Sequence, residues 1–323
     1  MNRLIVRYFL IFIGTGILLL FLLRGRTPFG KDNSSFSVEP DILVTRIDLF
    51  QGDKKLSIEK SGEYWLINNK DEARKTAILF ILRTLREIKI KSPVSAEIFD
   101  KEIISKNIDP VKVNIYAKRR LVKSFFVYIT ASNIYGNIMK IKPASKPFIV
   151  YVPGYEENIG THFIVNDLYW KPYSVFNLLP SQIDRVKVEF PDDTTSSYIV
   201  NYDKKIFSVS DLKKNISGWD SMKVKRYLTY FTSIAFETWA FDFPESEKKT
   251  LDSVPPLIKI SVKESQGEEI VLTVWEKWSF ADGNKKKDSD RVWAKTNNRD
   301  EIFIMRYFDL DPILKKRSYF FTE

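Results

Sequence analysis

The fold is decided by the stretch KLSIEKSGEYWLINN, residues 55–69. Apolar and polar side chains alternate through its first half, and a Ser61-Gly62 pair interrupts the pattern before the aromatic segment around Trp65. Alternation broken by a Ser-Gly pair is typical of two short strands joined by a turn. The sequence therefore predicts a hairpin here, with Trp65 on its second strand.

Another strand is predicted just before this hairpin, in ILVTRIDLF, residues 42–50. Leu43, Ile47 and Leu49 fall on one side of an extended chain, while Arg46 and Asp48 fall on the other. A strand with one face on a core and one face in water has this pattern. We expect these strands to pair in one antiparallel sheet.

A helix is predicted next. Asn69 and Glu72 have the spacing of a capping box, which indicates a helix from Asp71 to about Ile88. Its apolar residues recur at helical spacing, as in a helix that lies on a sheet: Ile78, Ile81, Leu82, Leu85 and Ile88. Four further short strands follow, in VKVNIYA, SFFVYIT, NIMKIK and FIVYV.

The same order of elements then repeats. DRVKVEF opens the second copy, and SSYIVNYDKKIFSVS places Ile206 and Phe207 where the first copy has Tyr64 and Trp65. A helix from about Asp220 to Glu237 and four more strand patterns complete it. We therefore predict an α+β fold of two tandem similar units, 41–180 and 181–323, each a mostly antiparallel sheet with a helix on one face.

Composition restricts the function classes. The 323 residues include no cysteine, which excludes disulfides and thiolate metal sites. The net charge is +10, of which four come from Arg3, Arg7, Arg24 and Arg26 near the amino terminus. The remaining +6 is spread among alternating lysines and acids, as in KKDSDR, and such mixing indicates a solvated surface. Nucleic-acid binding would favour an uninterrupted basic stripe with interleaved aromatic residues. We expect no nucleic-acid partner.

The amino terminus predicts a membrane anchor, residues 1–26, followed by a polar tether, residues 27–40. The run from residue 4 to residue 23 would form a helix of about 30 Å, the hydrocarbon thickness of a bilayer. Bulky leucines and arginines stand where a signal peptidase needs small residues, so we expect the segment to remain. Its predicted lipid contacts are Leu4, Phe9, Ile11, Leu18, Leu20 and Leu23. Arginines flank both ends and leave the orientation open.

These features together resemble the domain of unknown function 4340 family. The resemblance rests on Gly62-Glu63-Tyr64-Trp65-Leu66-Ile67, the predicted helix, Pro93-Val94, and the segment YWKPYSVFNLLPSQIDRVKVEF that connects the two units. The second unit lacks the Trp and the Pro-Val. The resemblance implies a bacterial protein held in the inner membrane with its bulk on the periplasmic side. It also implies a neighbouring membrane complex, such as an ABC-type transporter, and no catalytic residues.

No catalytic, cofactor or metal site is predicted. His162 is the single histidine and cannot by itself build a histidine metal site or a catalytic triad. Ser-x-x-Lys spacings occur at Ser57, Ser210 and Ser246, without the further elements that a serine acyl-transfer site needs. No glycine-rich phosphate loop follows a strand.

Aromatic residues are the remaining candidates for ligand contact: Tyr169, Trp170, Tyr173, Trp275 and Trp278. Trp275 and Trp278 are three apart, so on a regular strand they face opposite sides and one can be exposed. Exposed aromatic rings stack on sugars or anchor protein partners, whereas buried ones only pack.

We expect a non-enzymatic, membrane-anchored binding or scaffold protein. The alternatives are a cell-envelope polysaccharide binder or hydrolase that uses the aromatic cluster, and a purely structural spacer.

Overall fold

The computed structural model describes residues 13, 15, 35–130, 137–155, 158–203, 206–281 and 284–321. The chain divides into two compact units, Met1–Pro172 and Tyr173–Glu323, which we call unit 1 and unit 2. The division falls at Pro172 rather than Pro180, because β10 (Ser174–Phe176) pairs with β15 (Ile234–Ala235) of unit 2.

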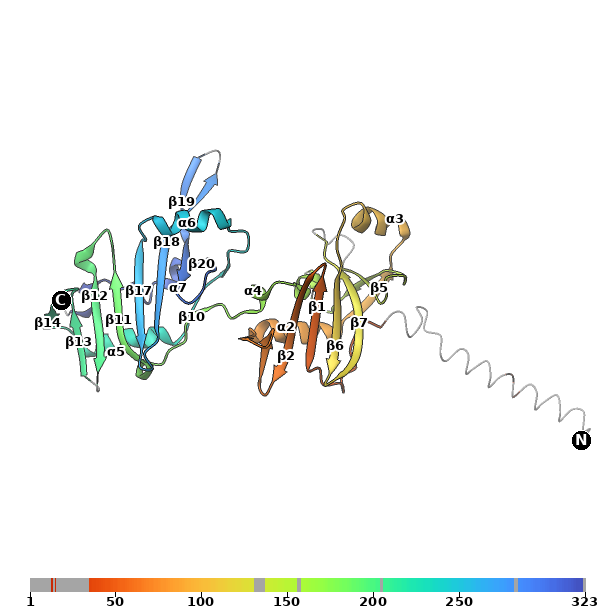
Figure 1. Ribbon diagram of the computed structural model, residues 1–323, viewed down its shortest axis with the longest axis horizontal. Helices are drawn as coiled ribbons and strands as arrows, with labels where there is room; N and C mark the ends of the chain where they lie inside the picture. The colour runs from red at the N-terminus through yellow and green to blue at the C-terminus, as the bar shows by residue number, and fades with distance from the viewer. Residues whose placement is uncertain are drawn as a thin grey trace, which may run out of the picture. The chain divides into compact units, whose positions relative to one another are not determined.

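Unit 1 is built on one antiparallel sheet of nine strands in the order β4-β3-β2-β1-β6-β7-β8-β9-β5. Figure 1 shows β2, β1, β6 and β7 of this sheet side by side. Its strands are β1 (Arg46–Gln51), β2 (Lys54–Ser61), β3 (Tyr64–Ile67), β4 (Asp71–Glu72), β5 (Lys89–Pro93), β6 (Val111–Ala117), β7 (Arg120–Tyr128), β8 (Asn137–Lys140) and β9 (Phe148–Tyr151). Its helices are α2 (Lys75–Glu87), α3 (Ala96–Phe99) and α4 (Asp167–Trp170), with a π-helical turn at Asp100–Ile104 and a 3₁₀ turn at Ile159–Phe163.

Unit 2 repeats this topology position for position. Its nine strands run in the order β14-β13-β12-β11-β17-β18-β19-β20-β16. They are β11 (Ile183–Glu189), β12 (Tyr198–Asp203), β13 (Ile206–Ser210), β14 (Asn215–Ile216), β16 (Thr238–Trp239), β17 (Ile258–Glu264), β18 (Glu269–Ala281), β19 (Asn284–Thr296) and β20 (Phe303–Arg306). The helices are α5 (Ser221–Thr229), α6 (Glu245–Ser253) and α7 (Tyr307–Leu310). The fold is therefore α+β, with two large and mostly antiparallel sheets.

Strand register shows which residues of the two units are equivalent. Ile58 pairs with Ile67 in unit 1, and Val200 pairs with Val209 in unit 2. The same registers align Trp65 with Phe207, as the sequence pattern predicts. These apolar rows point to the core, because alternate residues of a strand share one face.

One helix packs on each sheet. In unit 1 it is α2, whose inward residues Ala77, Ile78, Ile81, Thr84 and Leu85 are buried. In unit 2 it is α5, which buries Val224, Tyr227 and Leu228. The two helices begin equivalently, because the Ile78 N–H donates to Arg74 and the Val224 N–H donates to Asp220.

The predicted capping box of unit 1 is wrong. Asn68 and Asn69 adopt left-handed backbone angles, with φ of 49° and 58°, and form a turn. Asp71 and Glu72 then pair with β3 as a short strand, so the helix starts only at Lys75. Asn tolerates the left-handed region well, which favours this turn over a helix cap.

The second predicted helix is too long. Asp220 caps α5 through its side chain, but the helix ends at Thr229 and a 3₁₀ turn, Tyr230–Thr232, follows. The chain then becomes extended as β15. The prediction that Leu43 lies on the buried face of the first strand is also wrong, because Leu43 is 60% exposed and precedes β1.

Near the end of each unit, a buried aromatic residue is hydrogen-bonded to the start of the helix that packs on the sheet. The Arg74 N–H donates to the carbonyl of Trp170 at 2.6 Å, and the Asp220 N–H donates to that of Phe320 at 2.7 Å. Both rings are fully buried. The pair Tyr169–Trp170 and the pair Tyr319–Phe320 have similar edge-on geometries, with centroids 5.1 and 5.3 Å apart. We call this feature the aromatic lock.

Within the described ranges, no helix is both long and apolar enough to span a membrane. Of the predicted anchor, residues 1–26, only Ile13 and Thr15 are described, both as helical. The six predicted lipid contacts lie outside the described residues.

Candidate functional site

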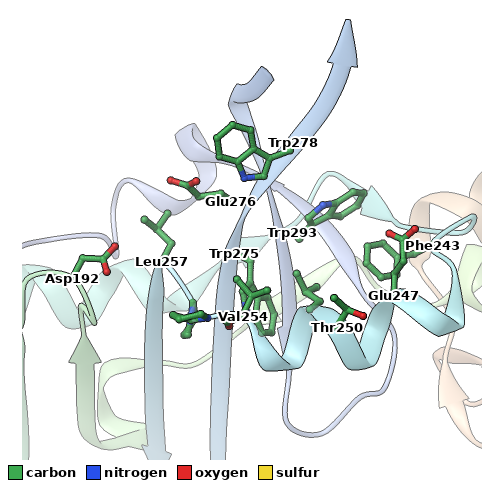
Figure 2. Close-up of a pocket in the computed structure, with 13 residues that line it drawn as sticks. Asp192, Phe243, Glu247, Thr250, Val254, Leu257, Trp275, Glu276, Trp278 and Trp293 are labelled. Atoms are coloured by element: carbon green, nitrogen blue, oxygen red, sulfur yellow. The ribbon is translucent and has the colours of Figure 1, made fainter. Parts of the chain in front are cut away.

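The most distinctive concave surface lies on unit 2 between α6 and the β18–β19 hairpin. It is a groove of about 550 Å³. Its lining residues are Asp192, Phe243, Glu247, Thr250, Leu251, Val254, Pro255, Pro256, Leu257, Trp275, Glu276, Trp278 and Trp293. We call it the tryptophan groove. Figure 2 shows Trp275, Trp278 and Trp293 gathered around it, with Phe243 and Glu247 at one side and Asp192 at the other.

A two-stranded ribbon carries part of the groove. β18 and β19 have 13 residues each, whereas β17 pairs with β18 only as far as Val274. β20 pairs with β19 only from Arg291 to Ala294. The hairpin therefore extends beyond its neighbours (Figure 1).

A register shift brings both β18 tryptophans into the groove. The three-residue spacing predicts opposite faces, but the ladder is irregular between Glu276 and Trp278. The register shifts by three residues there, because four residues of β19, 288–291, lie opposite the single residue Lys277 of β18. Such a bulge re-aims the side chains beyond it. Both rings consequently line the groove, with Trp275 4% exposed and Trp278 43% exposed.

The other aromatic walls are fixed by specific contacts. The Trp275 Nε1–H donates to the Val254 carbonyl at 3.0 Å, which attaches the segment after α6 to the sheet. Trp293 pairs with Trp275 across the ladder and meets Phe243 edge-on, with centroids 5.0 Å apart. The Lys277 ammonium lies 5.3 Å from the Trp293 ring centroid. These contacts hold Trp275, Trp293 and Phe243, and Trp278 presents the most surface to the groove.

The groove is acidic. Asp192, Glu247 and Glu276 are among its lining residues, and none of the described residues that line it is a lysine, arginine or histidine. Glu276 is paired with Lys287 of β19. Asp192 and Glu247 are exposed. Such a lining favours neutral or cationic ligands over anions.

A charged clamp lies where the ribbon leaves the sheet. The Glu237 carboxylate accepts two hydrogen bonds from Arg291, at 2.6 and 2.9 Å, and one from Arg306 at 3.0 Å. These bonds lower the pKa of Glu237 to about 2. Higher on the ribbon, Lys277 and Asp288 form an ion pair of 3.1 Å.

The other predicted aromatic contacts do not join this groove. Trp170 is fully buried in unit 1, where its Nε1–H donates to Ile164 at 2.9 Å. Tyr173 belongs to unit 2, and its ring stacks on Phe236 at 5.2 Å. Tyr169 packs edge-on to Trp170. Only Trp275 and Trp278 of the five lie at the groove.

His162 is a structural residue of unit 1. It is 6% exposed, and its Nδ1 lies 2.8 Å from the Thr84 hydroxyl of α2. Its Nε2 lies 3.2 Å from the Tyr155 hydroxyl, and its ring stacks on Phe80. Throughout the described part of the chain, no three His, Cys, Asp or Glu side chains are grouped to hold a metal ion.

Sequence reasoning missed Trp293, Phe243 and Glu247. The signal for Trp293 was the hairpin itself, since Trp275 and Trp293 lie on its two arms and pair directly. Phe243 lies on the connection from β16 to α6, and Glu247 lies in the first turn of α6. No local pattern shows that these segments lie beside β18.

Comparison with known proteins yields no match: no family model, no curated protein and no solved structure is similar to the chain. The resemblance to the domain of unknown function 4340 family therefore stays a prediction.

Proposed function

We propose that this chain is a membrane-anchored, non-enzymatic binding protein that serves a neighbouring membrane complex, such as an ABC-type transporter. The tryptophan groove of unit 2 carries the proposal, because it combines an exposed Trp278 with firmly held aromatic walls and acidic rims. Aromatic residues in a concave site are the usual anchors of binding interfaces. The partner segment that suits this lining is apolar with basic residues.

The anchor supports the same proposal. The apolar run 4–23 is long enough to cross a bilayer. Tethering confines the groove to a thin layer beside the membrane, which raises its effective concentration toward a partner in that membrane. The resemblance noted above favours an inner-membrane anchor with the units on the extracytoplasmic side.

Site-specific cross-linking in native membranes tests the partner. The chain has no cysteine, so a Glu247→Cys variant carries one reactive thiol at the groove. Gln266→Cys is the matched control, because it is exposed in the turn at the far end of β17 and β18. We expect a thiol-specific cross-linker to give a defined membrane-protein adduct from position 247 only. Equal adducts from both positions, or none from position 247, would contradict the groove as the contact.

A second candidate function is glycan binding from the same groove. The specific observation is Trp278, whose ring is 43% exposed beside carboxylates that could accept hydrogen bonds from sugar hydroxyls. Titration of the full chain with envelope glycans, followed by tryptophan fluorescence, tests this function. A saturable change that Trp278→Ala removes would support it, and no response to any envelope glycan would exclude it.

A further inference from the structure

We propose that the outer face of helix α2 in unit 1 docks on the surface of the lipid bilayer. This inference rests on the membrane anchor of the proposed function. The outer face consists of the exposed residues of the helix: Lys75, Thr76, Leu79, Phe80, Arg83 and Arg86.

Two large apolar side chains are exposed side by side on this face. Leu79 is 67% exposed and Phe80 is 45% exposed. Phe80 stacks partly on His162, whereas the inward face of α2 already fills the core with other residues. The core therefore does not require an apolar residue at position 79.

Unit 2 shows that the fold does not require this apolar pair. With Arg74 equivalent to Asp220 at the helix starts, Leu79 and Phe80 correspond to Lys225 and Arg226 of α5. The same position in the same topology is thus occupied by two cations in unit 2. An apolar pair in one repeat only indicates a surface with its own occupant.

The charge of the outer face suits an anionic bilayer. Lys75, Arg83 and Arg86 surround the apolar pair along the helix. Arg83 is paired with the neighbouring acid Glu87 at 2.9 Å, so the net positive charge of this face comes from Lys75 and Arg86. A helix with apolar residues between cations is typical of helices that lie in the membrane interface.

The route of the chain places this helix near the membrane. The Val38 N–H donates to the Leu85 carbonyl of α2 at 2.7 Å, so the chain arriving from the anchor joins unit 1 at this helix. Only 12 residues, 24–35, separate the predicted span from the buried Phe36. Fully extended, they reach about 40 Å. Leu79 lies about 9 Å along the helix from Leu85. The face is thus tethered within reach of the bilayer.

Solvent access to a fluorescent label tests the docking. Full-length Thr76→Cys and Met222→Cys variants, each labelled with one environment-sensitive dye, are reconstituted in phosphatidylcholine vesicles containing a quarter phosphatidylglycerol. The two positions are equivalent in α2 and α5, and both are exposed. Acrylamide, a neutral quencher, reports access to water. Flotation of the same vesicles reports whether the anchor inserts.

We expect quenching at position 76 to be about two-fold weaker than at position 222, because a flat lipid surface blocks one side of the label. Leu79→Glu should lower the ratio of docked to undocked α2 by about ten-fold, since it removes an apolar contact and adds a repelled charge. The matched change Lys225→Glu in unit 2 should leave quenching at position 76 unchanged.

Three outcomes would overturn the inference. Flotation with equal quenching at positions 76 and 222 would leave the anchor intact and refute the docking. Protection at position 76 that persists in Leu79→Glu would show that another surface shields the label. A chain that does not float with the vesicles would refute the anchor, and the docking with it.

Discussion

The aromatic lock makes a sharp prediction about Trp170, which sequence alone offered as a ligand contact. Replacing it with alanine should destabilise unit 1 strongly. The ring is fully buried, and its Nε1–H donates to the Ile164 carbonyl. Truncating a buried tryptophan to alanine costs about 3–5 kcal/mol, and the unpaired carbonyl contributes to that cost. A domain is stable by about 5–15 kcal/mol, so the loss is a large share of the total.

The control is Trp278→Ala, which removes the same side chain from a position that is 43% exposed. It should cost less than about 1 kcal/mol, since no buried cavity forms. Trp170→Phe introduces the residue that unit 2 has at the equivalent position, Phe320. Its loss of unfolding free energy should fall between those of Trp170→Ala and Trp278→Ala, because most of the ring volume is retained while the N–H donor is lost.

Denaturant titration of the full chain in detergent measures these costs. Hydrogen–deuterium exchange of peptides assigns each loss to a unit. Trp170→Ala should accelerate exchange in the core strands of unit 1 and leave β11 and β17 of unit 2 protected. A cost below about 1 kcal/mol for Trp170→Ala would refute the lock. If a saturable ligand response disappears in Trp170→Ala while unit 1 stays folded, Trp170 contacts the ligand and the structural explanation is wrong.

Three further changes test the structure elsewhere. Glu237→Gln should cost about 1 kcal/mol at neutral pH, since the clamp is partly exposed and screened. The pKa of Glu237 in the folded chain is about 2, below its ordinary 4.5, so this stability is fully present above pH 4.5 and is lost as the pH falls toward 2. Urea titrations should therefore separate native and variant at pH 7 and not at pH 2. Tyr227→Phe removes a buried hydroxyl that donates to the Ile313 carbonyl at 3.1 Å, and should lower the free energy of unfolding by about 1–2 kcal/mol; Tyr64→Phe, at a position that is 52% exposed, is the control. Gly62→Ala should cost about 1 kcal/mol from the backbone alone, because Gly62 has φ of +61° and an added Cβ meets no atom within 4 Å; a stabilised variant in thermal melts would contradict that reasoning.

Local patterns predicted the strands well because their physical cause is local. Apolar and polar residues alternate in DRVKVEF because one face of β11 is buried and the other is partly exposed to solvent. The order of nine strands could not be predicted in the same way, because β1 pairs with β6 across the whole helix α2. The repeat supplied what local patterns lacked, since two copies with one element order indicate one topology.

The tryptophan groove was only half visible in the sequence for a similar reason. Next to the turn of the β18–β19 hairpin, Ala281 pairs with Asn284. If this register continued along the whole hairpin, Asp290 would lie opposite Trp275. The shift between Glu276 and Trp278 moves Trp293 there instead. Bulges of this kind depend on the packing of neighbouring strands, which no spacing rule contains.

Because the two units share one topology, comparing them shows which features the fold requires. Features shared by both units, such as the aromatic lock and the inward face of the helix, are explained by packing. Features confined to one unit need another reason. Among the described residues, β7 and β8 have 9 and 4 residues, whereas β18 and β19 have 13 each. The positions of Leu79 and Phe80 in α2 are occupied by Lys225 and Arg226 in α5. Neither difference is demanded by the common topology, so both are surfaces on which the two units differ for a reason other than packing. We propose accordingly that unit 1 carries the contact with the lipid and unit 2 the contact with the partner. Exchanging Leu79-Phe80 with Lys225-Arg226 should then abolish the protection at position 76 without unfolding either sheet.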